Sequence, residues 1–358
     1  MLIKTEYSVL KTGRDDVSFI GMNTRSGFRS VKNGIIDEKE LKRTYIIKGG
    51  PGTGKSTLMR TVSDRFENDK IPVSRFLCSS DPDSLDAVLI NNSVLFIDGT
   101  APHVKEMKYP GACSEAICLS NFWSRDKLSA FRDEIVELTD GKTELFSRVY
   151  RIIHSINTLY LSAINDVGNC YLRKESEAAA NRLTRNITIP VKKASEYLVR
   201  SFGMKGAVRL DTLEKHAETI IKLRDYYGTG YIFMEDLFKS LKEKGIGFLY
   251  STEPMMEDKV TDIFVPEKNI LFTTEDVENA EKTINTERFI DIIKLRSCRG
   301  SVRLSVKCAN ELFKDAEALM KEIAIKHFRL EELYGAAMNF DAIGEYTKLL
   351  IKDVENYI

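Results

Sequence analysis

The pattern of apolar and polar residues predicts a strand, a loop and a helix within residues 44–66. Residues 44–48 form a short run that favours β structure, and a stretch rich in glycine follows it. Apolar side chains then recur at positions 58, 59, 62 and 66, which is the spacing of one helix face. We therefore expect a strand that enters a tight loop from which a helix leaves.

Two further apolar runs predict strands of the same sheet. The run at residues 72–79 ends in a turn that contains Asp81, and the run at residues 93–97 ends at Asp98. In open α/β sheets, ligands gather outside the carboxyl ends of the strands. Asp81 and Asp98 are therefore placed where a ligand could meet them.

Residues 126–181 carry a helical pattern with many charges. Apolar side chains recur at helical spacing, at positions 131, 135 and 138 and again at 145, 149, 152, 153 and 156. We expect a long helix or a helical hairpin, with a possible break at Asp140-Gly141. Its charged face is suited to solvent and equally to a protein partner.

The second half of the chain echoes the first in the same order. Residues 228–230 repeat the Gly-Thr-Gly of residues 52–54, at a separation of 228 − 52 = 176. Residues 248–254 echo residues 76–82 at 248 − 76 = 172, and residues 270–272 echo residues 94–96 at 270 − 94 = 176. The common order predicts an internal duplication.

The predicted architecture is α/β, with tandem domains that each contain a mainly parallel sheet and flanking helices. Because 358 residues exceed the size at which single cores stop growing, two domains are expected. We place the first domain at residues 1–190, with its helical extension at about 126–181. The second domain then covers residues 191–358 and ends in a helical extension.

Composition excludes some classes of partner. Lys plus Arg and Asp plus Glu both number 53, so the chain lacks the net positive charge of a broad nucleic-acid-binding surface. No apolar run approaches the ~20 residues of a membrane span, and the N-terminus lacks the pattern of a signal peptide. The six cysteines include no C-x-x-C pair, which favours free thiols and a cytoplasmic location.

The glycine-rich stretch matches the phosphate-binding pattern G-x-x-x-x-G-K-[ST], known as Walker A. Glycines let backbone N–H groups converge on phosphate oxygens, and the positive end of the following helix faces the same anion. Lys55 would supply positive charge to the β- and γ-phosphates, and the Ser56 hydroxyl can bind Mg²⁺. The predicted nucleotide-binding residues are Gly49, Gly50, Pro51, Gly52, Thr53, Gly54, Lys55, Ser56 and Thr57.

Asp98 is the predicted partner of this loop. Four apolar residues followed by an aspartate are typical of a Walker B strand, whose carboxylate holds Mg²⁺ directly or through water. Lys55 and Asp98 are thus the candidate catalytic residues, and Ser56 and Asp98 the candidate metal ligands. Asp81 and His103, which lie on loops downstream of these strands, are weaker candidates, because a histidine on a loop is often simply solvated.

The predicted second copy differs at each of these chemical positions. Aligned on the Gly-Thr-Gly echo, Tyr231 and Ile232 stand where the first copy has Lys55 and Ser56. Thr274 stands at the place of Asp98. We expect a retained fold that has lost its phosphate site, with Tyr231 filling the space near the loop.

The quoted motifs resemble those of a family of bacterial duplicated P-loop ATPase-like proteins. The shared segments are residues 48–57, Asp-Pro-Asp-Ser-Leu-Asp at 81–86, Asp-Gly-Thr-Ala-Pro-His at 98–103 and Tyr-Pro-Gly at 109–111. The resemblance spans nearly the whole chain. It implies an ATP-binding protein and says little about a substrate, and the degenerate second loop departs from relatives with two intact loops.

These patterns together predict a protein that binds ATP or GTP with Mg²⁺ and hydrolyses it slowly. One alternative is a kinase for a small molecule or nucleotide, although no arginine-rich lid is evident. Another is a non-hydrolysing nucleotide switch whose helical extensions bind a protein partner. Phosphate release, measured alone and with acceptors, separates the three.

Overall fold

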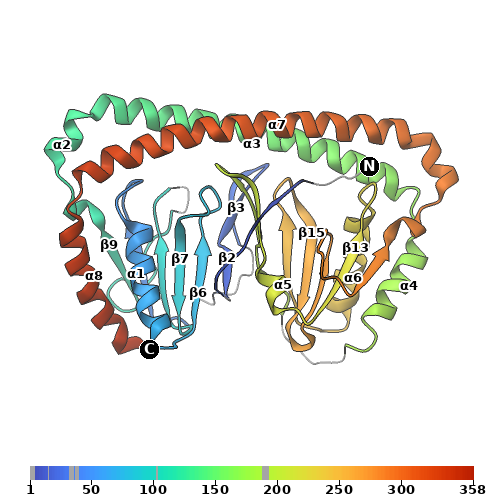
Figure 1. Cartoon of the computed structure of the whole chain (residues 1–358), viewed down its shortest axis with the longest axis horizontal. Helices are drawn as coiled ribbons and strands as arrows, with labels where there is room; N and C mark the ends of the chain where they lie inside the picture. Colours follow the sequence, from blue (N-terminus) through green and yellow to red (C-terminus); the bar gives the residue numbers. More distant parts are fainter. Residues whose placement is uncertain (1–4, 15, 32–35, 37–39, 102–103, 188–192) are drawn as a thin grey trace. The chain divides into compact units, whose positions relative to one another are not determined.

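The computed structural model describes residues 5–14, 16–31, 36, 40–101, 104–187 and 193–358. The fold is mixed α/β, with two larger sheets in which parallel pairings predominate, as expected from the sequence (Figure 1). The chain divides into two compact units. We call residues 16–21, 36–148 and 319–358 the Lys55 unit, and residues 1–15, 22–35 and 149–318 the Arg200 unit.

The units are not the consecutive domains 1–190 and 191–358 that the sequence suggested. Each combines segments from both halves of the chain, because two long helices contribute to both units. Helix α3 (Arg132–Gly168) belongs to the Lys55 unit as far as residue 148, and α7 (Ile292–Ala337) belongs to it from residue 319 onward. Apolar periodicity identifies such helices, but it does not say which core each part of them covers.

The sheet of the Lys55 unit has the order β2-β6-β7-β8-β5-β9. Strand β7 is antiparallel to both of its neighbours, and the other pairings are parallel. Its strands are β2 (Val17–Phe19), β5 (Arg43–Lys48), β6 (Val73–Leu77), β7 (Leu85–Ile90), β8 (Val94–Asp98) and β9 (Ser114–Cys118). The helices within this unit are α1 (Lys55–Asn68), the short 3₁₀ helix η1 (Leu119–Phe122), α2 (Arg125–Ala130) and α8 (Phe340–Val354), followed by η4 (Glu355–Tyr357).

Strand β5 lies in the middle of the Lys55 unit's core because its side chains alternate between the two faces of the sheet. Tyr45 and Ile47 pack into one cluster with the apolar face of α1 and with α8. Ile46 packs into the cluster on the opposite face. The strand is therefore buried on both faces, which fixes the point at which the following loop begins.

The main sheet of the Arg200 unit has the order β10-β14-β15-β16-β13-β17. It repeats the sequence of parallel and antiparallel pairings seen in the Lys55 unit, strand for strand. Its strands are β10 (Ser195–Glu196), β13 (Thr219–Arg224), β14 (Leu249–Glu253), β15 (Met256–Val265), β16 (Ile270–Thr273) and β17 (Lys282–Asn285). Its helices include α4 (Arg173–Leu183), α5 (Thr212–His216), α6 (Thr229–Glu243), η2 (Pro266–Lys268) and η3 (Thr286–Phe289).

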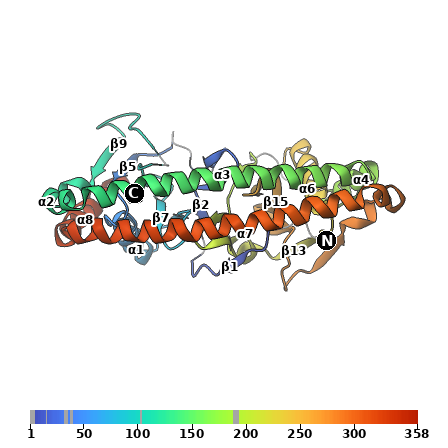
Figure 2. The same cartoon turned by 90° about the horizontal axis from the view of Figure 1, so that it is seen from above.

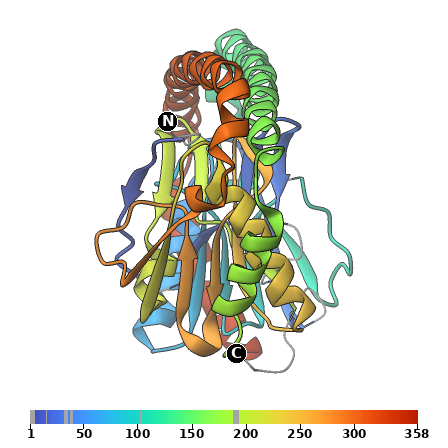
Figure 3. The same ribbon diagram turned by 90° about the vertical axis from the view of Figure 1, so that its right-hand side faces the viewer.

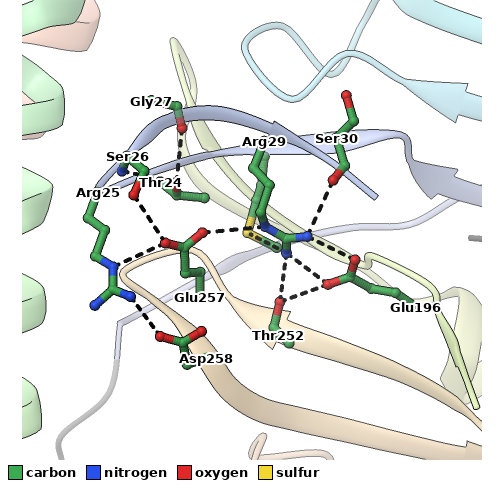
Figure 4. A network of polar contacts seen from close by, with 11 residues as sticks. Thr24, Arg25, Ser26, Gly27, Arg29, Ser30, Glu196, Thr252, Glu257 and Asp258 are labelled. Atoms are coloured by element: carbon green, nitrogen blue, oxygen red, sulfur yellow. Dashed lines mark hydrogen bonds and ion pairs between the residues drawn. The ribbon is translucent and has the colours of Figure 1, made fainter. Parts of the chain in front are cut away.

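Two smaller sheets complete the description. Strands β1 (Ser8–Leu10), β12 (Gly206–Leu210) and β11 (Arg200–Gly203) form one, and β3 (Gly21–Thr24) pairs with β4 (Gly27–Ser30) in the other. Figure 4 shows how charges hold the β3–β4 hairpin in the Arg200 unit. Arg29 Nη2 lies 2.8 Å from a Glu196 carboxylate oxygen, and Arg25 Nη2 lies 2.7 Å from Asp258 Oδ2. Because Arg29 and Glu196 are mostly buried, this pair fixes the hairpin more firmly than the exposed Arg25–Asp258 pair does.

The helical region differs from its prediction in where it breaks. Helix α3 runs through Asp140-Gly141 without interruption, and the breaks fall at Phe131 and at residues 169–172. Gly141 packs closely against α7, since a Cβ there would lie 3.2 Å from Lys326 Nζ. A glycine inside a helix costs only about 1 kcal/mol, and packing of this kind can offset it.

The strand pairing keeps one of the expected echoes and shifts another. Val94 pairs with Ile90 as Ile270 pairs with Val265, which keeps the predicted separation of 176. On the other edge of β7, Ser74 pairs with Leu89 in the same way as Leu249 pairs with Phe264. These corresponding residues are 249 − 74 = 175 positions apart. Phe248 therefore corresponds to Val73, three residues from the position expected from the apolar pattern.

The loops differ in length, so the Gly-Thr-Gly echo is also misplaced. Gly54 caps α1 with φ 90°, and Gly228 caps α6 with φ 80°. The first cap follows its strand by 54 − 48 = 6 residues and the second by 228 − 224 = 4. Lys55 thus corresponds to Thr229 and Ser56 to Gly230, so the pairing of these residues with Tyr231 and Ile232 is wrong.

Each unit covers its first long helix with a helix from the other half of the sequence. In the Lys55 unit α8 packs on α1, with Ile343 and Leu350 in the same core cluster as Leu58. In the Arg200 unit α4 packs on α6 (Figure 3), and Ser240 Oγ donates a hydrogen bond to Asn181 Oδ1 (2.7 Å). Each half of the sequence therefore supplies the helix that covers the first helix of the other half's main sheet.

The backbone bonds at the entry to these covering helices are equivalent. Asn339 N–H donates to the Phe122 carbonyl oxygen (2.8 Å), and Leu172 N–H donates to the Phe289 carbonyl oxygen (2.7 Å). The separations 339 − 172 and 289 − 122 are both 167. Subtracting 167 from a residue number on α7 therefore gives the corresponding residue on α3.

No helix within the described ranges is both long enough and apolar enough to cross a membrane. All six cysteines are free thiols.

Candidate functional site

The glycine loop (residues 49–54) joins β5 to α1, which confirms the predicted order of strand, loop and helix. Gly52 and Gly54 have φ values of 67° and 90°, a region that other residues adopt only with strain. Thr53 closes the loop by donating its hydroxyl to the Gly50 carbonyl oxygen (2.8 Å). Glycine is therefore required at two of the predicted positions by backbone conformation alone.

Lys55 lies across the glycine loop. Its Nζ donates to the carbonyl oxygens of Gly49 and Gly50, at 2.7 Å each, and lies 3.5 Å from Asp98 Oδ2. Both side chains are 13% exposed. The structure thus brings the two candidate catalytic residues together, with a positive charge held over the amides of the loop.

Asp98 ends β8 beside the glycine loop, and its Oδ1 accepts a hydrogen bond from Thr100 N–H (2.8 Å). Burial raises the pKa of the Asp98 carboxyl, against the opposing influence of Lys55 and Thr100. The negative charge of Asp86 raises it further. Ala87 pairs with Ile97 across the antiparallel strands, so Asp86 stands directly opposite Asp98.

Asp86 is a site residue that the sequence analysis did not single out. Like charges directly opposite each other destabilise an antiparallel pair unless something compensates them. Asp86 stood inside the quoted Asp-Pro-Asp-Ser-Leu-Asp segment. Only the strand pairing shows that it is a neighbour of Asp98.

The residues present suit one hard cation bound mainly by phosphate and water. The Ser56 hydroxyl oxygen accepts a hydrogen bond from Leu85 N–H (3.0 Å), which places it next to the start of β7 and Asp86. Among the described residues, no group of three or more His, Cys, Asp or Glu side chains could hold a metal by itself. Mg²⁺ bound with nucleotides usually takes only one or two carboxylates. Ser56 and Asp98, with Asp86 nearby, fit that pattern.

The two weaker candidates have different outcomes. Asp81 is buried, and its carboxylate accepts bonds from Asp83 N–H (3.3 Å) and the Ser84 hydroxyl (3.2 Å). These bonds close the turn between β6 and β7 and give Asp81 a structural role there. His103 lies outside the described residues, so its role stays a prediction.

Helices α7 and α8 cover the outer side of the glycine loop, which the sequence did not predict. A Cβ on Gly52 would lie 2.3 Å from the Glu331 carbonyl oxygen, and one on Gly50 would lie 3.1 Å from the Tyr334 ring. A Cβ on Gly54 would lie 3.3 Å from the Phe340 ring. The glycines thus serve both backbone conformation and the close approach of α7.

Charged side chains from α3 and α7 join the site in the same unit. Glu331 Oε1 lies 3.4 Å from His327 Nε2, and the Glu331 backbone lies against Gly52. The pKa of Glu331 is lowered, first by the bond to His327 and then by Lys55 and Gly52. On α3, burial and the nearby charge of Lys55 lower the pKa of Lys142.

The corresponding loop of the Arg200 unit is filled by its own side chains. Asp225 follows β13, and its Oδ1 accepts hydrogen bonds from Gly230 N–H (3.0 Å) and the Thr229 hydroxyl (3.4 Å). Thr274 N–H donates to the Thr261 carbonyl oxygen (3.0 Å), so threonines take the places of Asp98 and Asp86. Tyr231 is buried in the core, with its pKa raised by burial.

No protein-family model matches the chain, and no curated protein or solved structure is detectably similar to it. The resemblance to duplicated P-loop ATPase-like proteins therefore stays an expectation. The geometry and chemistry of the Lys55 unit carry the functional argument.

Proposed function

We propose that the Lys55 unit binds ATP or GTP at residues 49–57 and hydrolyses it slowly. The observation that carries this proposal is the position of Lys55, which is held over the glycine loop and lies 3.5 Å from the Asp98 carboxylate. A bare turn between strand and helix needs neither group. An anion cradled by loop amides, with a lysine and a metal-binding carboxylate beside it, is what triphosphate chemistry requires.

In this proposal Mg²⁺ is held by Ser56 and Asp98, and it would neutralise charge on the phosphate oxygens. Lys55 leaves the carbonyl oxygens of Gly49 and Gly50 and turns to the phosphates. The loop amides, fixed in advance by the backbone, stabilise the charge that develops during phosphoryl transfer. The neighbouring carboxylates Asp86 and Asp98 favour a cation at this edge of the sheet.

We further propose that the two units arose by duplication and that only one retains nucleotide binding. The matching strand orders and the equivalent bonds at the helix entries support a common origin. The loss of Lys55, Ser56 and Asp98 equivalents supports a single site. A protein partner for the helical extensions remains a prediction from their charged faces.

The test is isothermal titration with Mg·ATP and Mg·GTP, using the Lys55→Ala variant. We expect that loss of this charge weakens binding by about a hundredfold or more, because contacts to charged groups contribute about 1.5–3 kcal/mol each. The control is Thr229→Ser, the equivalent position in the other loop, which keeps its hydroxyl and should bind normally. Tyr231→Ala is unsuitable, since it would open a cavity in the core.

Native mass spectrometry at saturating Mg·ATP should show one nucleotide per chain. Phosphate release, measured alone and with small-molecule acceptors, then separates hydrolysis from phosphotransfer and from binding alone. Unchanged affinity in Lys55→Ala would mean that the glycine loop is a structural turn.

A further inference from the structure

Two cysteines that are far apart in the sequence meet in the Arg200 unit. Cys170 stands in the turn that follows α3, and Cys298 lies in the second turn of α7. In this unit the end of α3 lies beside the start of α7 (Figure 2), and the two Sγ atoms are 3.9 Å apart. The Sγ atoms of Cys170 and Cys298 also lie 3.6 Å and 3.8 Å from one acceptor, the Asp166 carbonyl oxygen. Both thiols therefore point to the same place.

The backbone around this pair is fixed by hydrogen bonds. Asp291 N–H donates to the Cys170 carbonyl oxygen (2.8 Å), and Tyr171 forms a β-bridge with Ile290. The turn that carries Cys170 is thereby tied to the start of the helix that carries Cys298. A disulfide has an S–S bond of about 2.05 Å. The approach of the two sulfur atoms from 3.9 Å to that length falls mainly to the side chains.

The equivalent place in the Lys55 unit has residues of another kind. Ser124 N–H donates to the Ala337 carbonyl oxygen (2.9 Å), which is the same backbone bond 167 residues away, since 291 − 124 and 337 − 170 are both 167. The same correspondence places Ala337 where the Arg200 unit has Cys170, and Phe131 where it has Cys298. This backbone arrangement does not need cysteines, so their presence at both positions adds a chemical capacity.

We propose that Cys170 and Cys298 form a reversible disulfide when the protein meets hydrogen peroxide. Cys298 is only half-buried and meets the oxidant first. Its sulfur takes one oxygen and becomes a sulfenic acid, while the O–O bond breaks and water leaves with the thiol proton. The Cys170 sulfur then attacks the sulfenic sulfur, the S–O bond breaks, and a second water leaves with the Cys170 proton. Two thiols are oxidised and one peroxide is reduced to two waters, and a dithiol reverses the change by exchange.

The two cysteines bracket the whole main sheet of the Arg200 unit. Helices α4 and α6 and all six strands of that sheet lie between them in the sequence. The disulfide would close a loop with a sequence separation of 298 − 170 = 128. A cross-link over so long a loop removes conformational entropy from the unfolded chain. Oxidation therefore makes this unit harder to unfold.

The experiment treats the full chain with hydrogen peroxide, alkylates the remaining thiols and analyses the digest by mass spectrometry. We expect a cross-link between Cys170 and Cys298, loss of two of the six free thiols, and recovery of both with dithiothreitol. The midpoint of thermal unfolding should rise by about 5 °C or more in the oxidised protein. Cys170→Ser should lose the cross-link and the rise, and its Cys298 should be trapped by dimedone, which reacts with sulfenic acids.

The matched control is Cys308→Ser, because Cys308 is an exposed thiol on the same helix. This variant should keep the cross-link and the rise in midpoint. Oxidised wild type without the cross-link between Cys170 and Cys298, a cross-link through Cys308 in its place, or a cross-link without the rise would overturn the proposal. None of these outcomes bears on the nucleotide site, since both cysteines belong to the Arg200 unit.

Discussion

The loops that follow the two central strands are supported by groups from different sources. In the Arg200 unit the Gly230 amide donates to the carboxylate of Asp225, which lies inside the loop itself. In the Lys55 unit the backbone of Glu331, on a helix distant in sequence, lies against Gly52. A contact within the loop depends on the loop alone, whereas a contact from α7 depends on how that helix packs.

The residues around the two loops also differ, with charged side chains near the loop of the Lys55 unit and apolar side chains or threonines at the corresponding positions of the Arg200 unit. By the register of 167 residues, Glu331 and Tyr334 correspond to Ile164 and Val167 on α3, which are buried apolar side chains. Asp86 and Asp98 correspond to Thr261 and Thr274. The Lys55 unit thus keeps charged side chains beside its loop, and the Arg200 unit has threonines or apolar side chains at the corresponding positions. The same fold can serve a site or a core, according to a few side chains.

The largest effect should come from breaking the internal charge balance of the Arg200 unit. Arg200 is fully buried, bonds Asp262 at 2.7 Å and also pairs with Glu275. Arg200→Leu would leave two buried carboxylates uncompensated and lower the free energy of unfolding by about 3–5 kcal/mol. Urea denaturation followed by circular dichroism measures this change.

Arg182→Leu, at an exposed position on α4, is the control and should change stability by less than about 0.5 kcal/mol. If Arg200→Leu were equally mild, the Arg200 unit would not depend on its internal charges, and the comparison would fail.

A smaller effect tests the approach of α7 to the glycine loop. Gly52→Ala adds a Cβ that would lie 2.3 Å from the Glu331 carbonyl oxygen, at a φ of 67°. Strain in this conformation alone costs about 1–2 kcal/mol, and the overlap adds to it. Gly111→Ala isolates the strain, because Gly111 has φ 74° and nothing within 4 Å of an added Cβ. Thermal unfolding should show a larger loss for Gly52→Ala, and equal losses would show that α7 can move aside freely.

The smallest effect concerns the paired carboxylates. Because burial raises the pKa of Asp98, this group favours folding most below its ordinary pKa. That contribution is lost as the pH rises through the folded-state pKa. Asp98→Asn should therefore stabilise the nucleotide-free protein at neutral pH, by roughly 0.2–1 kcal/mol for relief of a like-charge pair. Mg²⁺-dependent turnover should be lost at the same time.

Thr274→Val, at the equivalent position of the other unit, should bring no such stabilisation and leave turnover intact. Denaturation curves at pH 4 and pH 7 check the sign, since the difference between wild type and Asp98→Asn should shrink at the lower pH. A difference that grew there would contradict the assignment.

The local parts of the candidate site could be predicted from sequence, and the distant parts could not. Residues 44–66 carry a strand pattern, special glycines and a helix pattern within one short stretch, so the loop was identified correctly. The position of Asp98 followed from its place at the end of a buried strand. Asp86, Lys142 and Glu331 join the site only through strand pairing and helix packing, which periodicity does not specify. The register of the second loop was missed because that loop is two residues shorter than the loop before α1, so its Gly-Thr-Gly lies at a different place relative to the helix.

The reciprocal covering of α1 by α8 and of α6 by α4 has a consequence for how the chain holds together. Neither half of the sequence contains both a loop-bearing helix and the helix that covers it. A half on its own would bury those faces only by exchanging helices with a second copy, as a domain-swapped dimer does. Joining the halves covalently replaces that bimolecular step with an intramolecular one at high effective concentration. The second half therefore supplies α8, the helix that covers α1 of the Lys55 unit.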